Sequence, residues 1–451
     1  MVSMSKGKVL ILNLYSPFHY GGIETHVYFM IRNFLKNGFE VHLITEPASK
    51  TKKKLRDLSD INLADSRFHH HYLPIKLSNL KMDPSQHLKL VEEVWMKTLK
   101  NFISRMNGET FDIIITNMYI EALVVFKLYD KVKSNTPIIV SYIHDTVWDI
   151  PRRYRSEIKK YEQRLYKILK EGQKNIILGV LSHYLYHYTV KQSNITKDYL
   201  KILKPCIDYE YIRKKANFRN NIEYRLSLLE SRNVTIINPA RLIPRKMHIV
   251  SLILSRKLNK IGVRNIIYLT PWKFPEGEHL AYDLDIVQVY MAKLNQLITS
   301  SGLPVRKQVL DYTSLLDILS TSHFMLLPSL CEPFGYSVIE SYLVDTPVIV
   351  SNSGALPELC WHTKTGFIIG VEYPETKRIL SIVSKDELIH ILNELWKSKN
   401  LKQSIEYLID FLEYIFENPN EYRRLVKSIN AYRRDILNYG IDIFDIIKSR
   451  A

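Results

Sequence analysis

The sequence predicts an α/β protein of two domains, each built on a parallel sheet. Short apolar runs alternate along the chain with longer segments of helical spacing. Most of these runs are continuous in Val, Ile and Leu, which is the pattern of strands buried on both faces of a parallel sheet. The alternation occurs twice with a polar stretch in between, and a chain of 451 residues has room for two such domains.

The expected strands follow one another in two series. The first series lies at residues 9–14, 41–45, 68–75, 112–117, 138–143 and 176–181, and the second at 234–238, 265–270, 324–327, 348–351 and 366–369. Strands that alternate with helices in this way form right-handed βαβ units. We therefore expect two Rossmann-like β/α/β domains.

The expected domain limits follow from where the strand series begin and end. We place an N-terminal domain at residues 1–206 and a C-terminal domain at 233–420. Residues 207–232 are rich in Arg, Lys and Asn and contain no strand run, so we interpret them as the connection between the domains. Residues 421–451 are expected to form a helical tail, because apolar side chains recur there at three- and four-residue spacing.

The composition narrows the possible partners and compartments. The formal net charge of +17 favours the binding of anionic partners such as nucleic acid, anionic lipid or phosphorylated small molecules. A basic surface that is simply solvated is the alternative. Three scattered cysteines offer neither a disulfide framework nor a zinc-finger spacing. No apolar run approaches the roughly 20 residues of a membrane-spanning helix. We therefore expect a cytoplasmic protein, either dissolved in the cytoplasm or peripheral at the cytoplasmic face of a membrane.

The strongest chemical signal is the segment PSLCEPFGYSVIE at residues 328–340, directly after the expected strand at 324–327. Open α/β sheets bind ligands at the carboxyl ends of their strands. Gly335 permits close backbone approach, and a helix that begins near Tyr336 would direct its free N–H groups at the ligand. Glu332 lies in the loop and Glu340 about 6–8 Å further along the helix, which suits two hydroxyl-bearing rings of one ligand.

A second signal is the segment NPARLIPRK at residues 238–246, after the first strand of the second series. Arg241 and Lys246 lie at the same carboxyl edge, where two cations can neutralise a departing diphosphate. Arg245 is an alternative to Lys246 in this role. A solvated basic loop is the competing interpretation.

Two further signals lie in the first series. Gly21 and Gly22 precede an amphipathic helix and resemble a loop that approaches phosphate, whereas the full G-x-G-x-x-G pattern of nicotinamide dinucleotide binding is absent. His144 and Asp145 directly follow the expected strand at 138–143. A histidine buried at the end of a strand is the structural alternative for His144.

Together these segments resemble the retaining glycosyltransferases of GT-B fold, family 4, also called glycosyl transferases group 1. Residues 332–340 match the E-x7-E signature of that family. The resemblance implies that Glu332 binds hydroxyls of the donor sugar and Glu340 the ribose hydroxyls of the nucleotide. It also implies that backbone amides hold the sugar and phosphates, at Phe334, Gly335, Tyr336 and Ser337.

The resemblance extends to the other segments. Residues 241–246 match a G-R-L-x-x-x-K-G turn in which Pro239 and Ala240 replace the usual glycine, which implies that Arg241 and Lys246 bind the diphosphate. Gly22 would face the donor phosphates and the acceptor. His144 would contact the donor sugar near the reacting carbon.

The implied fold is two Rossmann-like domains facing each other across a cleft, with the C-terminal tail packing back on the N-terminal, acceptor-binding domain. The implied reaction transfers a hexose from a UDP- or GDP-sugar to a hydroxyl of a lipid-linked or growing glycan, with retention of configuration. The leaving phosphate oxygen would deprotonate the acceptor while Arg241 and Lys246 stabilise the charge. No metal or other cofactor is then required.

Several alternatives are weighed against this one. A glycogen- or starch-synthase-like enzyme shares the E-P-F-G segment but prefers Lys-x-Gly near the N-terminus, where this chain has Gly21 and Gly22. A non-catalytic nucleotide-sugar or nucleic-acid binding protein is the rival of another class. The run of three histidines at residues 69–71 alternates across a strand and is interpreted as structural, and Asp283 and Asp285 lie in a helical stretch, so neither predicts a metal site.

Two basic clusters predict a possible membrane contact. One is KTKKKLR at residues 50–56, and the other is formed by Arg152, Arg153 and Arg155. An anionic surface contributes about 1 kcal/mol per nearby basic residue. Leucines and an isoleucine between residues 55 and 63 add a modest apolar face, and a solvated basic loop is the alternative.

Overall fold

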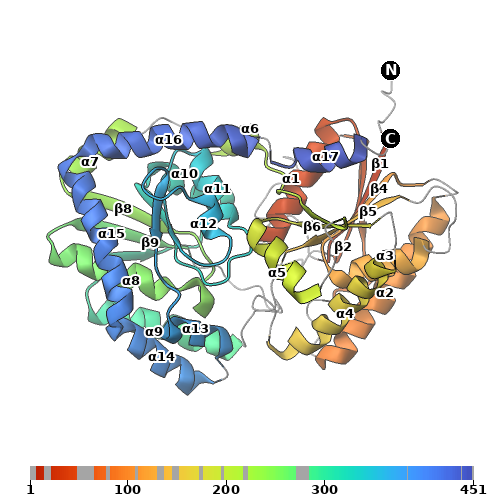
Figure 1. The fold of residues 1–451 in the computed structure, drawn as a ribbon, viewed down its shortest axis with the longest axis horizontal. Helices are drawn as coiled ribbons and strands as arrows, with labels where there is room; N and C mark the ends of the chain where they lie inside the picture. Colours follow the sequence, from red (N-terminus) through yellow and green to blue (C-terminus); the bar gives the residue numbers. More distant parts are fainter. Residues whose placement is uncertain are drawn as a thin grey trace. The chain divides into compact units, whose positions relative to one another are not determined.

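The computed structural model describes residues 7–14, 22–47, 65–77, 82–106, 110–129, 137–144, 152–171, 176–193, 198–216, 222–270, 284–382, 384–437 and 439–448 of the chain. The chain divides into two compact units (Figure 1). Met1–Asp208 and Asn438–Ala451 belong to the first unit, and Tyr209–Phe274 and Tyr282–Leu437 belong to the second.

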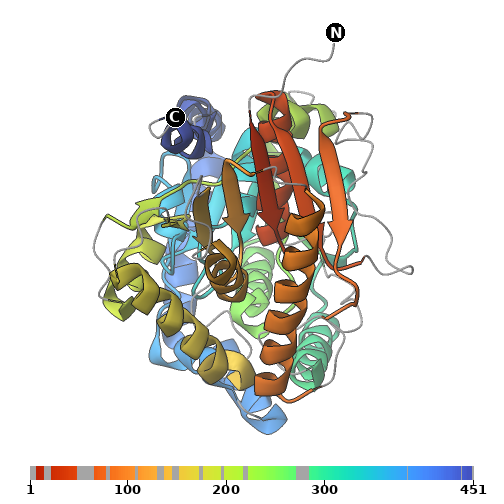
Figure 2. The same cartoon turned by 90° about the vertical axis from the view of Figure 1, so that its right-hand side faces the viewer.

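The first unit is built on a parallel sheet in the order β3-β2-β1-β4-β5-β6-β7. Its strands are β1 Lys8–Leu12, β2 Glu40–Thr45, β3 Phe68–Tyr72, β4 Ile113–Thr116, β5 Ile138–Ile143, β6 Ile176–Val180 and β7 Leu200–Ile202. Its helices are α1 Gly22–Lys36, α2 Pro84–Arg105, α3 Tyr119–Tyr129, α4 Arg152–Lys170, α5 His183–Ser193 and α17 Ile441–Lys448. Helices α2, α3 and α4 pack against one another (Figure 2).

The second unit has a parallel sheet in the order β10-β9-β8-β11-β12-β13. Its strands are β8 Asn233–Asn238, β9 Arg264–Leu269, β10 Val305–Lys307, β11 Phe324–Leu327, β12 Val348–Ser351 and β13 Gly366–Ile369. Its helices are α6 Tyr209–Lys215, α7 Ile222–Glu230, α8 His248–Lys260, α9 Leu284–Ser300, α10 Tyr312–Thr321, α11 Tyr336–Leu343, α12 Leu356–Leu359, α13 Pro374–Lys377, α14 Lys385–Lys397, α15 Lys399–Glu417 and α16 Pro419–Leu437, with short 3-10 helices η2 Pro244–Lys246 and η3 Arg378–Ser381.

In each sheet the first strand lies in the interior. The next strands are added on one side of it and the later strands on the other side, which is the strand order of a doubly wound Rossmann-like fold. The prediction of two Rossmann-like domains is therefore confirmed. Each expected strand is present, and their continuous Val and Ile side chains are buried, as in β4 and β12. Two short strands, β7 and β10, were not predicted. Each has three residues, includes exposed Lys or Arg side chains and lies at a sheet edge, so neither has an apolar run to reveal it.

The polar stretch expected to connect the domains contributes α6 and α7 to the second unit. Arg225 of α7 explains the difference, because its guanidinium is buried and donates to the carbonyl oxygens of Ser322 at 3.1 Å and Asp345 at 3.0 Å. The same guanidinium lies over the Tyr422 ring at 5.5 Å. A basic residue that satisfies buried carbonyl groups looks like a surface residue in the sequence alone.

The C-terminal tail divides between the units. Helix α16 stays with the second unit, where Arg433 forms an ion pair with Asp345 and the Tyr422 hydroxyl donates to the His323 carbonyl at 2.9 Å. Helix α17 belongs to the first unit, where the Phe444 ring lies 5.0 Å from that of Phe34. Among the described residues, no helix has both the length and the apolar character needed to cross a membrane.

Candidate functional site

The loops that follow β8, β11 and β12 meet at one edge of the second sheet. These strands are neighbours and run parallel, so their carboxyl ends share an edge. The backbone N–H of Leu330 donates to the Arg245 carbonyl at 2.8 Å, which ties the loop after β11 to η2. The backbone N–H of Cys331 donates to the Ser353 hydroxyl at 3.1 Å, which ties the same loop to the one after β12. The two segments singled out in the sequence are thus brought together.

The backbone of Glu332 packs closely against Gly354 in the loop after β12. The N–H of Ala355 donates to the Glu332 carbonyl at 2.8 Å. Gly354 has a φ of +63°, and a Cβ atom there would lie 2.4 Å from the Glu332 carbonyl oxygen, so only glycine fits. Cys331, although not a glycine, has a φ of 56°. Such strained backbone is found disproportionately at functional sites.

The carboxylate of Glu332 forms an ion pair with the ammonium of Lys246, with only 14% and 9% of the two side chains exposed. Burial lowers the pKa of Lys246 to about 8, although Glu332 opposes the shift. Burial alone would raise the pKa of Glu332, but the charges of Lys246 and Arg245 and the hydrogen bond from Lys246 outweigh it and lower this pKa. The pair is therefore charged at neutral pH.

Two arginines add positive charge beside this pair. Arg245 is 5% exposed, and its charge contributes to the lowered pKa values of both Glu332 and Lys246. Arg241 is partly exposed, and its guanidinium makes no hydrogen bond or ion pair with the described part of the chain. Its charge is nevertheless close enough to lower the pKa of Lys246. Lys246 and Arg245 act on the carboxylate of Glu332, and Arg241 acts on Lys246, so three cations and one carboxylate leave a net positive site suited to an anion.

Helix α11 begins at Tyr336, as predicted, after Gly335 with a φ of 105°. No side chain caps its first turn. Backbone N–H groups at the start of a helix are donors that suit an anionic ligand. Glu340 lies in its second turn with 6% exposure, and its Oε1 accepts a 2.8 Å hydrogen bond from the Tyr312 hydroxyl. Phe334 is buried beneath the turn, whereas Tyr336 and Ser337 are partly exposed.

In the first unit, His144 directly follows β5 and is 6% exposed. Its Nε2 lies 2.9 Å from Oδ1 of Asn117, which follows the neighbouring strand β4. The Asn117 Nδ2 donates to the Leu12 carbonyl at 3.1 Å, which fixes the amide orientation. Nε2 of His144 therefore carries the proton, and Nδ1 is left as an acceptor. Burial lowers the pKa of His144 to about 3, so the imidazole is neutral.

Two more titratable groups support this histidine. The His26 ring of α1 meets the His144 ring edge-on, with 5.1 Å between centroids. Glu121 of α3 accepts a 2.9 Å hydrogen bond from the Asn117 backbone N–H. Burial raises the pKa of Glu121 to about 8, against the effect of that hydrogen bond, so this carboxyl is mainly protonated at neutral pH. The carboxyl edge of this sheet thus carries a neutral hydrogen-bonding group.

The remaining residues named in the sequence analysis are either exposed or lie outside the described residues. Gly22 is the exposed first residue of α1, while Gly21 lies outside the described residues. The basic segment 50–56 and Asp283 also lie outside them, as do the side chains of Arg152 and Arg153 at the start of α4. Asp285 is half exposed and pairs with Lys385 at 3.1 Å, which fits its structural interpretation.

The histidine run alternates across β3 as expected, but β2 adds partners that the sequence reading missed. His69 Nε2 lies 3.3 Å from Oε1 of Glu40, and His71 Nε2 lies 3.3 Å from Nδ1 of His42.

Four residues of the candidate site were not predicted from the sequence: Tyr312, Gly354, Asn117 and Glu121. For Gly354 and Asn117 a signal existed, since each follows a strand at the carboxyl edge, whereas Tyr312 and Glu121 depend on tertiary packing.

Comparison with protein families gives two matches that lie in different units. Residues 20–211 match the model described as Glycosyltransferase Family 4, and residues 278–394 match the model described as Glycosyl transferases group 1. The second match contains Glu332 and Glu340. A comparison of the sequence with curated proteins found no match.

Several solved structures share the fold over nearly the whole chain. Sucrose-phosphate synthase from Thermosynechococcus elongatus has a TM-score of 0.58 at 15% identity, covering 94% of this chain and 100% of that one. HepE from Anabaena, in complex with UDP and glucose, has a TM-score of 0.50 at 15% identity, covering 96% and 99%. WaaG, a glycosyltransferase involved in lipopolysaccharide biosynthesis, has a TM-score of 0.51 at 12% identity, covering 94% and 99%.

The family matches, the double Rossmann-like fold and the clustered carboxyl-edge loops agree with one another. They show an enzyme that transfers glycosyl groups. The chain belongs to the group 1 glycosyltransferases of GT-B fold.

Proposed function

We propose that this glycosyltransferase transfers a hexose from a UDP- or GDP-sugar to a hydroxyl of a lipid-linked or growing glycan, with retention of anomeric configuration. The observation that carries the proposal is the buried Lys246–Glu332 pair, flanked by Arg241 and Arg245 and followed by Glu340 one loop and one helical turn later. A positive site with two separated carboxylates suits a ligand that has a diphosphate between two hydroxyl-bearing rings.

In this proposal Arg241 and Lys246 bind the donor diphosphate. Without a ligand, Glu332 is the counter-ion that keeps Lys246 charged in a buried position. A diphosphate can take over this role, because it offers several anionic oxygens to the same ammonium and to Arg241. Glu332 is then released to accept hydrogen bonds from hydroxyls of the donor sugar.

The remaining donor contacts come from α11 and its preceding loop. Glu340 accepts a hydrogen bond from Tyr312 through Oε1, which holds the side chain in place, and we propose that its carboxylate also accepts hydrogen bonds from ribose hydroxyls. Backbone N–H groups at Gly335, Tyr336 and Ser337, with Phe334 packed below, would bind the sugar and phosphates at the uncapped start of α11. We also propose that Gly22, the first residue of α1, contacts the donor phosphates.

The chemistry requires a proton acceptor and stabilisation of the leaving group. We propose that a β-phosphate oxygen of the donor takes the proton of the acceptor hydroxyl as the bond from the anomeric carbon to that phosphate breaks. The new glycosidic bond forms on the same face, so configuration is retained. Arg241 and Lys246 stabilise the charge that develops on the nucleoside diphosphate, so the transfer step calls for no metal or other cofactor.

His144 fits a positioning contact with the donor sugar better than acid–base catalysis. Its pKa of about 3 keeps it neutral, and Asn117 occupies its Nε2–H. The free Nδ1 is a hydrogen-bond acceptor for a sugar hydroxyl near the reacting carbon. The UDP and glucose complex of HepE and the lipopolysaccharide role of WaaG support the donor and acceptor classes proposed here.

A donor panel tests the proposal. The purified chain is incubated with UDP- and GDP-hexoses and a lipid-linked glycan acceptor, nucleoside diphosphate release is measured, and the anomeric configuration of the product is read by proton NMR. We expect release from one donor class and a product with the configuration of the donor. An inverted product, or no transfer with any nucleotide sugar, would contradict the proposal.

A further inference from the structure

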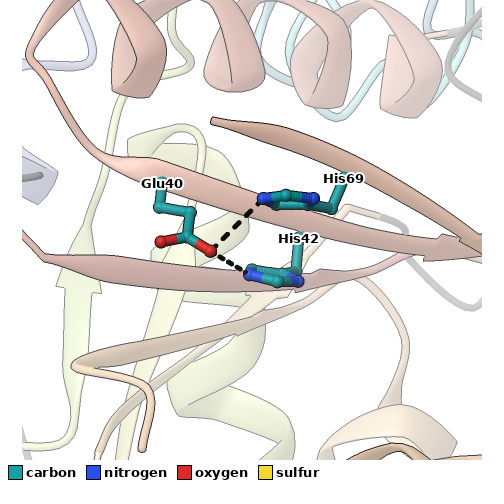
Figure 3. Close-up of side chains that lie close together, drawn as sticks. All are labelled: Glu40, His42 and His69. Carbon is teal, nitrogen blue, oxygen red and sulfur yellow. Dashed lines mark hydrogen bonds and ion pairs between the residues drawn. The ribbon is translucent and has the colours of Figure 1, made fainter. Parts of the chain in front are cut away.

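A cluster of one carboxylate and two imidazoles, Glu40, His42 and His69, lies on one face of β2 and β3 in the first unit (Figure 3). Glu40 is the first residue of β2 and His42 lies two residues further on. His69 of the edge strand β3 is the register partner of His42. Side chains two residues apart along a strand share a face, so Glu40, His42, His69 and His71 all lie on the same side of the sheet.

The distances within this cluster match those between ligands of one metal ion. His42 Nε2 lies 2.9 Å and His69 Nε2 lies 3.3 Å from the same oxygen, Oε1 of Glu40 (Figure 3). One ligand atom from each residue lies within 4.8 Å of the others. Two ligands that each lie about 2.0–2.2 Å from a tetrahedral zinc ion are separated by roughly 3.3 Å. Only small side-chain adjustments would be needed to admit an ion.

The surroundings hold His42 in the orientation that a ligand requires. Its second nitrogen, Nδ1, lies 3.3 Å from Nε2 of His71, and the two rings are almost parallel with an angle of 2°. The rings of Phe102 and Phe111 pack edge-on against His42 at 5.8 and 5.3 Å. Metal-ligating histidines almost always bind an outer partner through their second nitrogen, which fixes the tautomer and the ring.

We propose that Glu40, His42 and His69 bind one divalent transition-metal ion of the zinc type, with water as the fourth ligand. Two imidazoles and one carboxylate are a donor set that zinc accepts. With 39% of the His69 side chain and 21% of the Glu40 side chain exposed, the site is open to an ion and to water. The Lys8 ammonium lies 3.6 Å from the other carboxylate oxygen, Oε2, so it competes with the ion without blocking Oε1.

The position of the site indicates a structural role. Glu40 and His42 lie toward the amino end of β2, whereas His144 and Asn117 follow the carboxyl ends of their strands. An ion shared by β2 and β3 would fasten the edge strand to the sheet. It would therefore stabilise the first unit and take no part in sugar transfer, and the inference stands whether or not the proposed donor is correct.

The test uses the full chain after treatment with a chelator. Zinc chloride is titrated by calorimetry, Co²⁺ is followed by its visible absorption, and thermal unfolding is recorded with and without zinc. We expect one ion per chain, a tetrahedral Co²⁺ spectrum and a rise in the unfolding temperature with zinc. His69→Gln and Glu40→Gln should each weaken binding about tenfold or more and abolish the rise, and His71→Gln should weaken binding about 10- to 100-fold.

His70→Gln is the matched control, because His70 lies on the same strand but contacts the Thr45 hydroxyl at 2.9 Å on the other face. This variant should bind zinc as the unchanged chain does. Lys8→Met should bind zinc more tightly, since it removes a competing cation. The proposal is overturned if the unchanged chain shows no one-to-one binding, if both His69→Gln and Glu40→Gln bind as tightly as it does, or if His70→Gln loses binding as they do.

Discussion

The charge on Lys246 depends on a balance that pH can disturb. Its pKa is lowered to about 8 by burial, with Glu332 opposing and Arg245 and Arg241 adding to the shift. A cation with a lowered pKa loses its proton as the pH rises through that value, so donor activation should weaken above about pH 8. We expect kcat/KM, which reports the free enzyme, to fall along an alkaline limb near this pH.

Lys246→Arg provides the comparison, because a guanidinium stays protonated throughout the accessible range. Each profile is scaled to its own maximum, so a lower absolute rate in the variant does not affect the result. The limb near pH 8 should be absent from the Lys246→Arg profile. If it persists there unchanged, a group other than Lys246 causes it.

Glu332 and Glu340 are expected to act on different parts of the donor. Glu332→Gln should reduce transfer and the discrimination between donor sugars while it leaves affinity for the free nucleoside diphosphate nearly intact. Glu340→Gln should weaken nucleoside diphosphate binding about tenfold, because a contact to ribose stabilises ground and transition states alike. Calorimetry with UDP and GDP, together with kcat and KM for each donor, separates the two. Equal losses of nucleoside diphosphate affinity would contradict this division.

At the scale of elements, the loop that carries Glu332 depends on one glycine of another loop. Gly354→Ala combines an unfavourable positive φ with a Cβ atom 2.4 Å from the Glu332 carbonyl oxygen. Gly262 has a similar φ of +74° but nothing within 4 Å of the added Cβ, so Gly262→Ala measures the φ effect alone. We expect Gly354→Ala to lower the free energy of unfolding by at least about 1 kcal/mol more than Gly262→Ala, and to impair donor binding.

Urea unfolding of both variants, with binding of the donor measured in parallel, checks this expectation. Gly262→Ala should keep normal donor affinity, since Gly262 lies in the turn before β9 at the amino end of that strand. Equal destabilisation of the two variants would mean that the loop adapts to the added methyl group and that Gly354 does not position Glu332.

The elements also show what the sequence can and cannot predict. Apolar runs such as Ile138–Ile143 and Phe324–Leu327 are the observed strands residue for residue, and Gly335 marks the start of α11. The strands of a parallel sheet can be predicted from the sequence because both of their faces are buried, which requires a continuous run of apolar side chains. Arg225 and Glu40 are different, because Arg225 bonds to a carbonyl group far along the chain and Glu40 contacts His69 on the neighbouring strand.

At the scale of the whole molecule, the basic clusters support our proposal of peripheral attachment to an anionic membrane. The cluster at residues 50–56 lies outside the described residues, and Arg155 of the other is partly exposed in α4. Changing Lys52, Lys53 and Lys54 to Ser should weaken liposome binding by on the order of 100-fold at most, given about 1 kcal/mol per basic residue near the surface. Flotation with vesicles of increasing anionic content measures the effect.

Salt provides the control for this attachment, since screening shortens the reach of surface charges to about 8 Å at physiological ionic strength. Binding should rise with anionic lipid and fall with salt. If the unchanged chain fails to float with strongly anionic vesicles at low salt, attachment through anionic lipid is excluded, and the result points to a soluble acceptor.

The central claim is that the positive site around Lys246 and Glu332 activates a nucleotide-sugar donor. Arg241 tests it most directly, because this partly exposed guanidinium makes no hydrogen bond or ion pair among the described residues and so contributes little to folding. Arg264, exposed at the amino end of β9, is the matched control. The measurement is the rate of nucleoside diphosphate release from the preferred donor with acceptor present. We predict that Arg241→Ala lowers this rate about 100- to 1,000-fold in a folded protein while Arg264→Ala leaves it unchanged. A near-normal rate in Arg241→Ala would contradict the account.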